Sequence, residues 1–199
     1  MVVGFIGSGN MAAAMARGWA GAEQNSPSKM LFTDSGSGRA TALAGEVGGQ
    51  AVDSNEDLVR NSDVVVLAVK PASLEEVAAS LPAPRAVLSL LGATPLARLA
   101  EQFPDSTVIR LMPNLAVEVR TGVICMADPE GADEGIVAEC RSLLEAISTV
   151  FASRSTLTSA CGSAAMTADS TAALQCSQLM SGTENFMVGS SDLGIDTHP

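Results

Sequence analysis

The first 20 residues, MVVGFIGSGNMAAAMARGWA (1–20), decide the fold, because a strand pattern gives way to a helix pattern within them. Val2–Ile6 is a short apolar run containing β-branched and aromatic residues, which is typical of a buried strand. The stretch after Gly9 is rich in alanine and methionine and favours a helix. Between the two, residues 7–12 read GSGNMA and match the spacing G-x-G-x-x-A.

This spacing at a strand-to-helix turn is the fingerprint of a dinucleotide-binding site. Gly7 permits the tight turn, Gly9 lets a pyrophosphate approach the main chain, and Ala12 lets the helix pack closely on the sheet. The N–H groups at the start of the helix would point at the phosphate oxygens, aided by the helix dipole. The stretch therefore predicts dinucleotide binding.

Strand and helix patterns continue to alternate along the chain. Further strands are expected at 30–34, 63–69, 86–92, 107–113, 122–127 and 148–152, and helices at 11–22, 39–47, 73–81, 94–103 and 133–147. Continuously apolar strands separated by helices predict parallel pairing with both faces covered. The expected fold class is α/β, a doubly wound Rossmann-type parallel sheet.

Two regions are expected from the change in composition after about residue 152. Residues 1–152 form the dinucleotide-binding Rossmann domain. Residues 153–199 are dense in Ser, Thr, Ala and Gly and form a truncated or divergent C-terminal segment. Within that segment, 163–180 is a candidate helix through which two chains could pair, and the remainder is loop.

Composition limits the partners and the chemistry. A net charge of −11 argues against nucleic acid and anionic membranes, and no apolar run is long enough for a membrane span. The four cysteines match no zinc spacing, so we expect free thiols, no metal and a cytoplasmic protein with a small-molecule substrate. The chain has no tyrosine, one histidine (His198) and two lysines (Lys29 and Lys70). Chemistry that needs little acid from the protein is therefore favoured, and no catalytic residue is assigned.

The nucleotide preference stays open at this stage. Asp34 lies 22 positions after Ala12, where an acidic residue commonly accepts from the ribose 2′-OH of NAD. Ser35, Ser37 and Arg39 follow it, and their hydroxyls, N–H groups and guanidinium could instead hold the 2′-phosphate of NADP. We expect NADP, with NAD as the alternative.

Four stretches together resemble one known family, the pyrroline-5-carboxylate reductases: GFIGSGNMA (4–12), VVVLAVKP (64–71), VLSLLGA (87–93) and VIRLMPN (108–114). The resemblance covers about residues 1–152. It implies reduction of the cyclic imine 1-pyrroline-5-carboxylate to L-proline, a step of proline biosynthesis, with NADPH or NADH. A protonated cyclic imine is already electrophilic, which agrees with the acid-poor composition.

The resemblance also implies roles for particular residues. Those expected around the pyrophosphate are Ile6, Gly7, Ser8, Gly9, Asn10 and Met11. Those expected at the adenosine are Asp34, Gly36 and Asn55. Those expected beside the nicotinamide and its ribose are Ala68, Val69, Lys70, Pro71, Leu90, Leu91, Gly92 and Ala93. Those expected at the substrate cleft are Met112, Pro113 and Asn114.

The chain departs from the family after the Rossmann domain. Residues 158–166 echo the family's entry to a helical C-terminal domain, but the Ser-Pro-Gly-Gly-Thr-Thr loop that holds the substrate carboxylate is missing. The alternative is therefore a dinucleotide-binding remnant or sensor without turnover. The β-hydroxyacid dehydrogenases share the opening fingerprint but place a catalytic lysine beyond the cofactor domain, and here no lysine follows Lys70.

Overall fold

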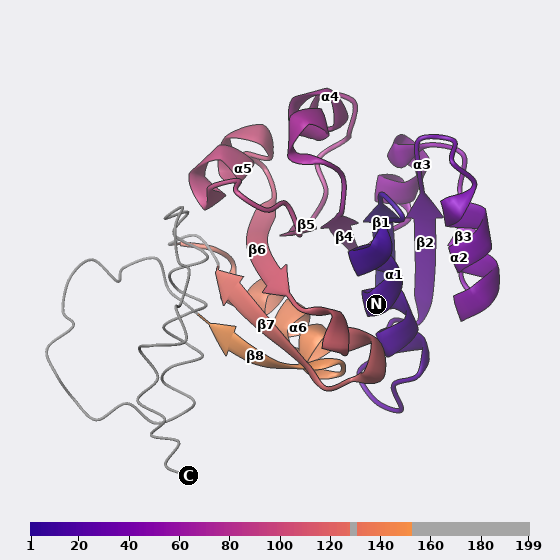
Figure 1. Ribbon diagram of the computed structural model, residues 1–199. Helices are drawn as coiled ribbons and strands as arrows, with labels where there is room; N and C mark the ends of the chain where they lie inside the picture. Colours follow the sequence, from indigo (N-terminus) through magenta and orange to yellow (C-terminus); the bar gives the residue numbers. More distant parts are fainter. Residues whose placement is uncertain (128–130, 153–199) are drawn as a thin grey trace, which may run out of the picture.

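The computed structural model describes residues 1–127 and 131–152. These residues form one eight-stranded sheet in the order β3-β2-β1-β4-β5-β6-β7-β8, with helices on both faces (Figure 1). The strands are β1 (Val2–Ile6), β2 (Lys29–Thr33), β3 (Gln50–Ala51), β4 (Val64–Leu67), β5 (Ala86–Ser89), β6 (Thr107–Pro113), β7 (Gly122–Ala127) and β8 (Ser148–Ala152). The helices are α1 (Asn10–Ala20), α2 (Arg39–Val47), α3 (Asn55–Arg60), α4 (Leu74–Ala79), α5 (Leu96–Gln102) and α6 (Glu134–Glu145), with two 3₁₀ turns, η1 (Pro71–Ser73) and η2 (Leu115–Val119). The α/β, Rossmann-type prediction is confirmed.

Two layers of helices explain why the central strands have no polar face. In β4, Val64 and Val66 belong to the core shared with α1, α2 and α6, whereas Val65 and Leu67 belong to the core shared with α3, α4 and α5. Figure 1 shows α3, α4 and α5 along one side of the sheet. Since successive side chains of a strand point to opposite faces, a sheet covered on both sides requires a continuous apolar run.

The order of the strands places a topological switch point between β1 and β4. β1 lies between β2 and β4 and pairs with both in parallel. The chain moves outward in one direction from β1 to β3 and in the other from β4 to β6. At such a switch point the connections diverge, and open α/β sheets commonly bind their ligands there, beyond the carboxyl ends of the strands.

One part of the predicted topology is wrong. β7 runs antiparallel to β6, with Met112 opposite Cys125, so the sheet is not wholly parallel. A parallel return needs a crossover of a dozen or more residues, and the short 114–121 connection is too brief for one. The sequence also did not predict β3, η2 or α3, whose start is capped by the Ser54 hydroxyl accepting from Asp57 N at 3.0 Å.

Helix α1 is the most deeply packed helix of its layer. Trp19 is fully buried, and its indole N–H donates to the Leu143 carbonyl at 2.8 Å, which ties α1 to α6. A Cβ on Gly18 would clash with the Val117 carbonyl oxygen of η2. The missing side chain therefore allows η2 to lie directly against α1.

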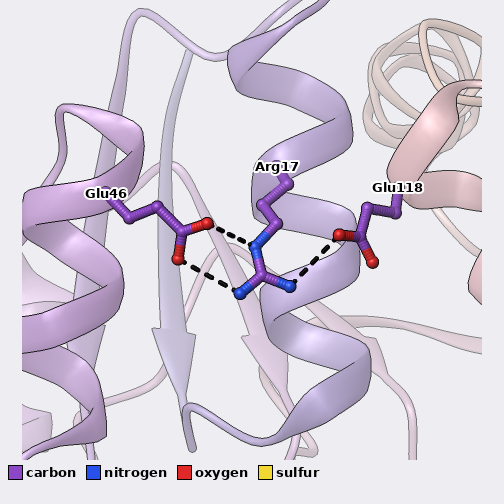
Figure 2. Close-up of polar contacts among 3 residues, drawn as sticks. All are labelled: Arg17, Glu46 and Glu118. Atoms are coloured by element: carbon purple, nitrogen blue, oxygen red, sulfur yellow. Dashed lines mark hydrogen bonds and ion pairs between the residues drawn. The ribbon is translucent and has the colours of Figure 1, made fainter.

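An exposed ion-pair network links α1 to its neighbours (Figure 2). Arg17 Nε lies 2.7 Å from Glu46 of α2, and Arg17 Nη1 lies 3.2 Å from Glu118 of η2. The hydrogen bond from Arg17 holds the pKa of Glu46 below its usual value. Because all three side chains are well exposed, these pairs orient the elements more than they stabilise the fold.

The cysteine expectation holds for one residue and is wrong for another. Cys140 is a free thiol, and burial raises its pKa to about 12. Cys125 is disulfide-bonded. Spacing alone could not reveal this, because a disulfide depends on how close the fold brings two cysteines.

The expectations for the C-terminal segment lie outside the described residues. They comprise the helix at 163–180, the loop that follows it, the family echo at 158–166 and the pairing of two chains. In the part of the chain that the structure describes, no helix is long and apolar enough to cross a membrane.

Candidate functional site

Gly7 makes the turn out of β1 in a conformation that needs glycine. Its φ is +96°, and its N–H donates to the Thr33 carbonyl at 3.1 Å. A Cβ at Gly7 would stand 2.6 Å from the Ala68 carbonyl oxygen, just after β4. Both the dihedral angle and the close approach of two main chains therefore exclude a side chain here.

Gly9 is different, because nothing in the protein itself requires glycine there. Its φ of −80° and ψ of −176° are extended values that any residue adopts. A Cβ at Gly9 would meet no heavy atom within 4 Å. The main chain at Gly9 thus borders open space, as the predicted diphosphate site requires.

The N-terminus of α1 offers its donors to that space. No side chain in the described residues caps it, and its first turn contains no acidic residue. The first hydrogen bond of the helix runs from the Ala13 N–H to the Gly9 carbonyl at 2.9 Å. The main-chain N–H groups that precede Ala13 at the start of α1 therefore remain as donors. Ser8 is buried and donates its hydroxyl to the Thr33 carbonyl at 3.1 Å, which leaves only its main chain at the opening. The arrangement suits an anion.

Asp34, directly after β2, accepts four hydrogen bonds from its own loop. Oδ1 accepts from the N–H groups of Gly36 (2.7 Å) and Ser37 (3.0 Å). Oδ2 accepts from the Ser37 hydroxyl (2.9 Å) and from the N–H of Ala40 (2.8 Å), in the first turn of α2. These donors, with the Ala40 N–H foremost, lower the pKa of Asp34 from its ordinary value of 3.8.

We expect Asp34→Asn to lower the free energy of unfolding by about 1 kcal/mol near neutral pH, because an amide replaces only part of these bonds. A lowered folded-state pKa gives stability that is complete above the ordinary pKa of 3.8 and is lost as the pH falls through the folded value. The difference between wild type and variant should therefore shrink below about pH 4. Urea unfolding across that range measures it, and a difference that persists in acid would contradict the role of the charge.

Thr33 lies among the predicted cofactor residues, although the sequence did not single it out. It is the last residue of β2 and is 4% exposed, and its hydroxyl donates to Asn55 Oδ1 at 2.7 Å. Asn55 begins α3 and was predicted to lie near the adenine. Because its carbonyl oxygen is engaged, its amide N–H₂ is directed away from Thr33. A polar residue ending an apolar strand was the available signal.

We expect Thr33→Val to weaken nucleotide binding about fivefold, the effect of losing one hydrogen bond that orients Asn55. Valine keeps the β-branched shape, so the fold should be retained. Thr33→Ser keeps the hydroxyl and serves as the matched control with near-normal affinity. Calorimetric titration with the reduced nucleotide compares the three proteins, and equal affinity for all of them would remove Thr33 from the site.

The predicted cofactor-binding stretches that follow β4 and β5 begin at the same end of the sheet, where the parallel strands have their carboxyl ends. Ala68 N donates to Ile6 O and Leu90 N donates to Leu67 O, both at 2.9 Å. Val69 is half-buried, whereas Lys70, Pro71, Gly92 and Ala93 are exposed. Leu91 is only 2% exposed and packs in the core with α4 and α5, so its side chain is turned into the protein.

Lys70 and Ala93 stand out among these residues, the first by its charge and the second by its main-chain conformation. Lys70 forms no ion pair with any described residue, so its ammonium group is free to meet an anion. Ala93 has a φ of +53°, an uncommon value for alanine, in the turn that leaves β5.

The predicted substrate-cleft residues have structural roles in this chain. Met112 packs against Cys125 and Ala127. Asn114 Oδ1 accepts from Val123 N at 3.1 Å and fixes the entry to β7. Pro113 is the last residue of β6 and lies past the part of this strand that pairs with β5. Their contact with a substrate stays a prediction.

The fold thus links several of the predicted cofactor residues, which lie on different elements, through main-chain and side-chain contacts. Gly7 touches the end of β4, its N–H binds the end of β2, and the hydroxyl of Thr33 reaches Asn55. The carboxyl ends of β2, β1, β4 and β5 therefore lie next to one another at the end of the sheet where β1 turns into α1. Fold and site define a Rossmann-type α/β domain.

Comparisons with known proteins agree. The family described as "NADP oxidoreductase coenzyme F420-dependent" matches residues 2–91. A pyrroline-5-carboxylate reductase of Synechocystis is 28% identical over 74% of this chain and 57% of its own length, and pyrroline-5-carboxylate reductase 2 of Rattus norvegicus is 35% identical over 64% and 42%. The structure of 1-pyrroline-5-carboxylate reductase from Streptococcus pyogenes superimposes with a TM-score of 0.68 at 25% identity, covering 76% of this chain and 57% of that one.

These matches confirm the resemblance to the pyrroline-5-carboxylate reductase family over about three quarters of the chain. The chain spans about half the length of the curated relatives it matches.

Proposed function

We propose that this protein is an NAD(P)H-dependent reductase of a cyclic imine, converting 1-pyrroline-5-carboxylate to L-proline. The observation that carries the proposal is the open main chain at Gly9 beside an uncapped helix N-terminus, in a chain whose relatives are named pyrroline-5-carboxylate reductases. Reduced nicotinamide, when bound, supplies the hydride for such a reaction.

The residues present fit this nucleotide. The N–H groups at the start of α1 would hold the diphosphate, and Asp34 and Asn55 would hold the adenosine. Lys70 would lie beside the nicotinamide and its ribose. The main contribution of these groups is to bind and orient the reactants, since a protonated imine needs no further proton from the protein. This agrees with a chain that has no tyrosine and only one histidine.

The decisive experiment follows nucleotide oxidation by the 199-residue chain with 1-pyrroline-5-carboxylate. Consumption of NADH or NADPH that depends on the imine supports the proposal. Tight nucleotide binding without any oxidation, even at high protein concentration, would instead favour the second candidate, a nucleotide-binding remnant or sensor. That candidate is less favoured, because the relatives are named as enzymes.

Pairing of two chains through residues 163–180 also belongs to the proposal. A second chain would supply groups that bind the substrate carboxylate, a role that is assigned to none of the described residues. Sedimentation as a monomer at the concentration used for the assay would contradict this part and leave the nucleotide site unaffected.

A further inference from the structure

We propose that the protein has a second ligand site, for an α-amino acid with a cationic side chain, in a hollow at the C-terminal end of α1. The hollow has a volume of about 410 Å³ and is lined by the turn that follows α1, the residue that ends η2 and the last turn of α6. This volume lies within the range of small-molecule sites.

The hollow is separate from the predicted nucleotide site. The predicted diphosphate position lies at the N-terminus of α1, whereas the hollow begins at Gly21, which follows the last residue of this helix. At a rise of about 1.5 Å per residue, the helix keeps the two sites about 16 Å apart. The proposal therefore goes beyond the proposed function and does not depend on it.

Three charged side chains line the hollow, and none of them is neutralised by a described residue. Glu23, Arg120 and Glu145 all belong to its lining. None of the ion pairs between described residues includes any of the three, so the guanidinium does not pair with either carboxylate. Each of these groups can therefore meet a charged group of a ligand.

Arg120 lies against the end of α1 in an uncommon main-chain conformation. A Cβ on Gly21 would clash with the Arg120 guanidinium, so this group lies directly over the main chain at Gly21. The φ of Arg120 is +61°, and that of Asn25, which also lines the hollow, is +54°. These are two of the three non-glycine residues with positive φ in the part of the chain that the structure describes. Such conformations cost free energy and are concentrated at ligand sites.

Glu145 occupies a position that is electrostatically unfavourable for a carboxylate. It is the last residue of α6, and no basic residue lies in the last turn of this helix. The C-terminus of a helix carries a partial negative charge, which repels a carboxylate. Because α1 also ends at the hollow, the C-termini of two helices add to the charge of Glu23 and Glu145 there. A cationic ligand would relieve this repulsion.

The charges of the lining indicate the class of ligand. Two carboxylates and one guanidinium leave one excess negative charge, so the complementary molecule carries one carboxylate and two cationic groups. The planar guanidinium of Arg120 suits a carboxylate, with which it forms paired hydrogen bonds. An α-ammonium group and a side-chain ammonium group would meet Glu23 and Glu145. An α-amino acid with a basic side chain has this set of charges.

The test is calorimetric titration of the full 199-residue chain with L-lysine and two molecules that each lack one of its charges. L-norleucine has no charge on its side chain, and 1,5-diaminopentane has no carboxylate. We expect saturable binding of L-lysine, and an affinity at least about tenfold lower for each of the other two, since each loses hydrogen bonds to a charged group. Binding of L-lysine should be unchanged when the reduced nucleotide is present.

Two variants place the binding in the hollow. Arg120→Asn should weaken L-lysine binding at least about tenfold and leave that of 1,5-diaminopentane within about twofold, because only the carboxylate loses its partner. Asparagine tolerates the left-handed conformation, so the fold is retained. Glu145→Gln should weaken L-lysine binding by about the same factor. Glu101→Gln is the matched control, because it removes an unpaired carboxylate from the last turn of another helix, α5, and it should bind L-lysine like wild type.

Four results would overturn the proposal. They are the absence of saturable L-lysine binding, equal affinity for L-norleucine, unchanged L-lysine affinity in Arg120→Asn, and competition between L-lysine and the reduced nucleotide. None of them affects the proposed function, which depends on nucleotide oxidation. The comparison of the three ligands needs no variant, so the test stands even if a variant does not fold.

Discussion

Gly9→Val should lower the affinity for the reduced nucleotide at least about 100-fold, because a branched side chain occupies the approach to the main chain and removes two or more charge-assisted hydrogen bonds. The same variant should fold normally, with a free energy of unfolding within about 0.5 kcal/mol of wild type. Extended dihedral angles accept valine, and no atom lies within 4 Å of the new Cβ. Loss of binding without loss of stability is the signature of a glycine kept for a ligand.

Gly45→Val is the control for this prediction. Gly45 is exposed on α2, and a Cβ there also meets nothing within 4 Å. The control therefore makes the same chemical change in equally open space, away from the turn. It should bind the nucleotide like wild type. Unchanged affinity in Gly9→Val, measured by the same titration, would show that the diphosphate does not lie against this part of the chain.

Gly7→Ala, in contrast, should destabilise the fold itself. The free energy of unfolding should fall by about 2–5 kcal/mol. Two costs add at this residue. The φ of +96° is strained for any side chain, and the new Cβ would lie 2.6 Å from the Ala68 carbonyl, which is main chain and cannot swing aside. Relief of the contact requires β1 and β4 to separate at the switch point.

Gly36→Ala separates the two costs. Gly36 has a similar φ of +87°, but a Cβ there meets nothing within 4 Å. It should therefore lose only the conformational part, about 1–2 kcal/mol. Urea unfolding of both variants gives the comparison. Equal losses would show that the contact with Ala68 does not matter.

Strand and helix positions were largely predictable, and their pairing was not. The apolar run at 63–69 and the amphipathic stretch at 133–147 lie within a few residues of β4 and α6. Local patterns record which residues are buried, so the elements could be located from the chain alone. The direction of β7 depends on the shortness of the 114–121 connection, which local strand and helix patterns do not record.

The residues of the candidate site were likewise predictable only in part. The fingerprint and Asp34 were evident, because their spacing along the chain carries the signal. Thr33 was missed, since its role depends on Asn55, which the fold brings to it from another element. Leu91 was predicted to contact the cofactor, but its side chain is in the core, and strand alternation beyond β5 could not be followed into the turn.

By itself, the sequence determined an α/β domain with a dinucleotide fingerprint at its first turn, because burial and tight turns leave local patterns of residue type. Only the tertiary structure decided why each small residue is there. A side chain at Gly7 is excluded by the Ala68 carbonyl just after β4, whereas the main chain at Gly9 borders open space. Asp34 accepts hydrogen bonds from its own loop. The Gly7 contact joins residues that are distant along the chain, and the open space at Gly9 exists only in the folded structure, so residue spacing encodes neither.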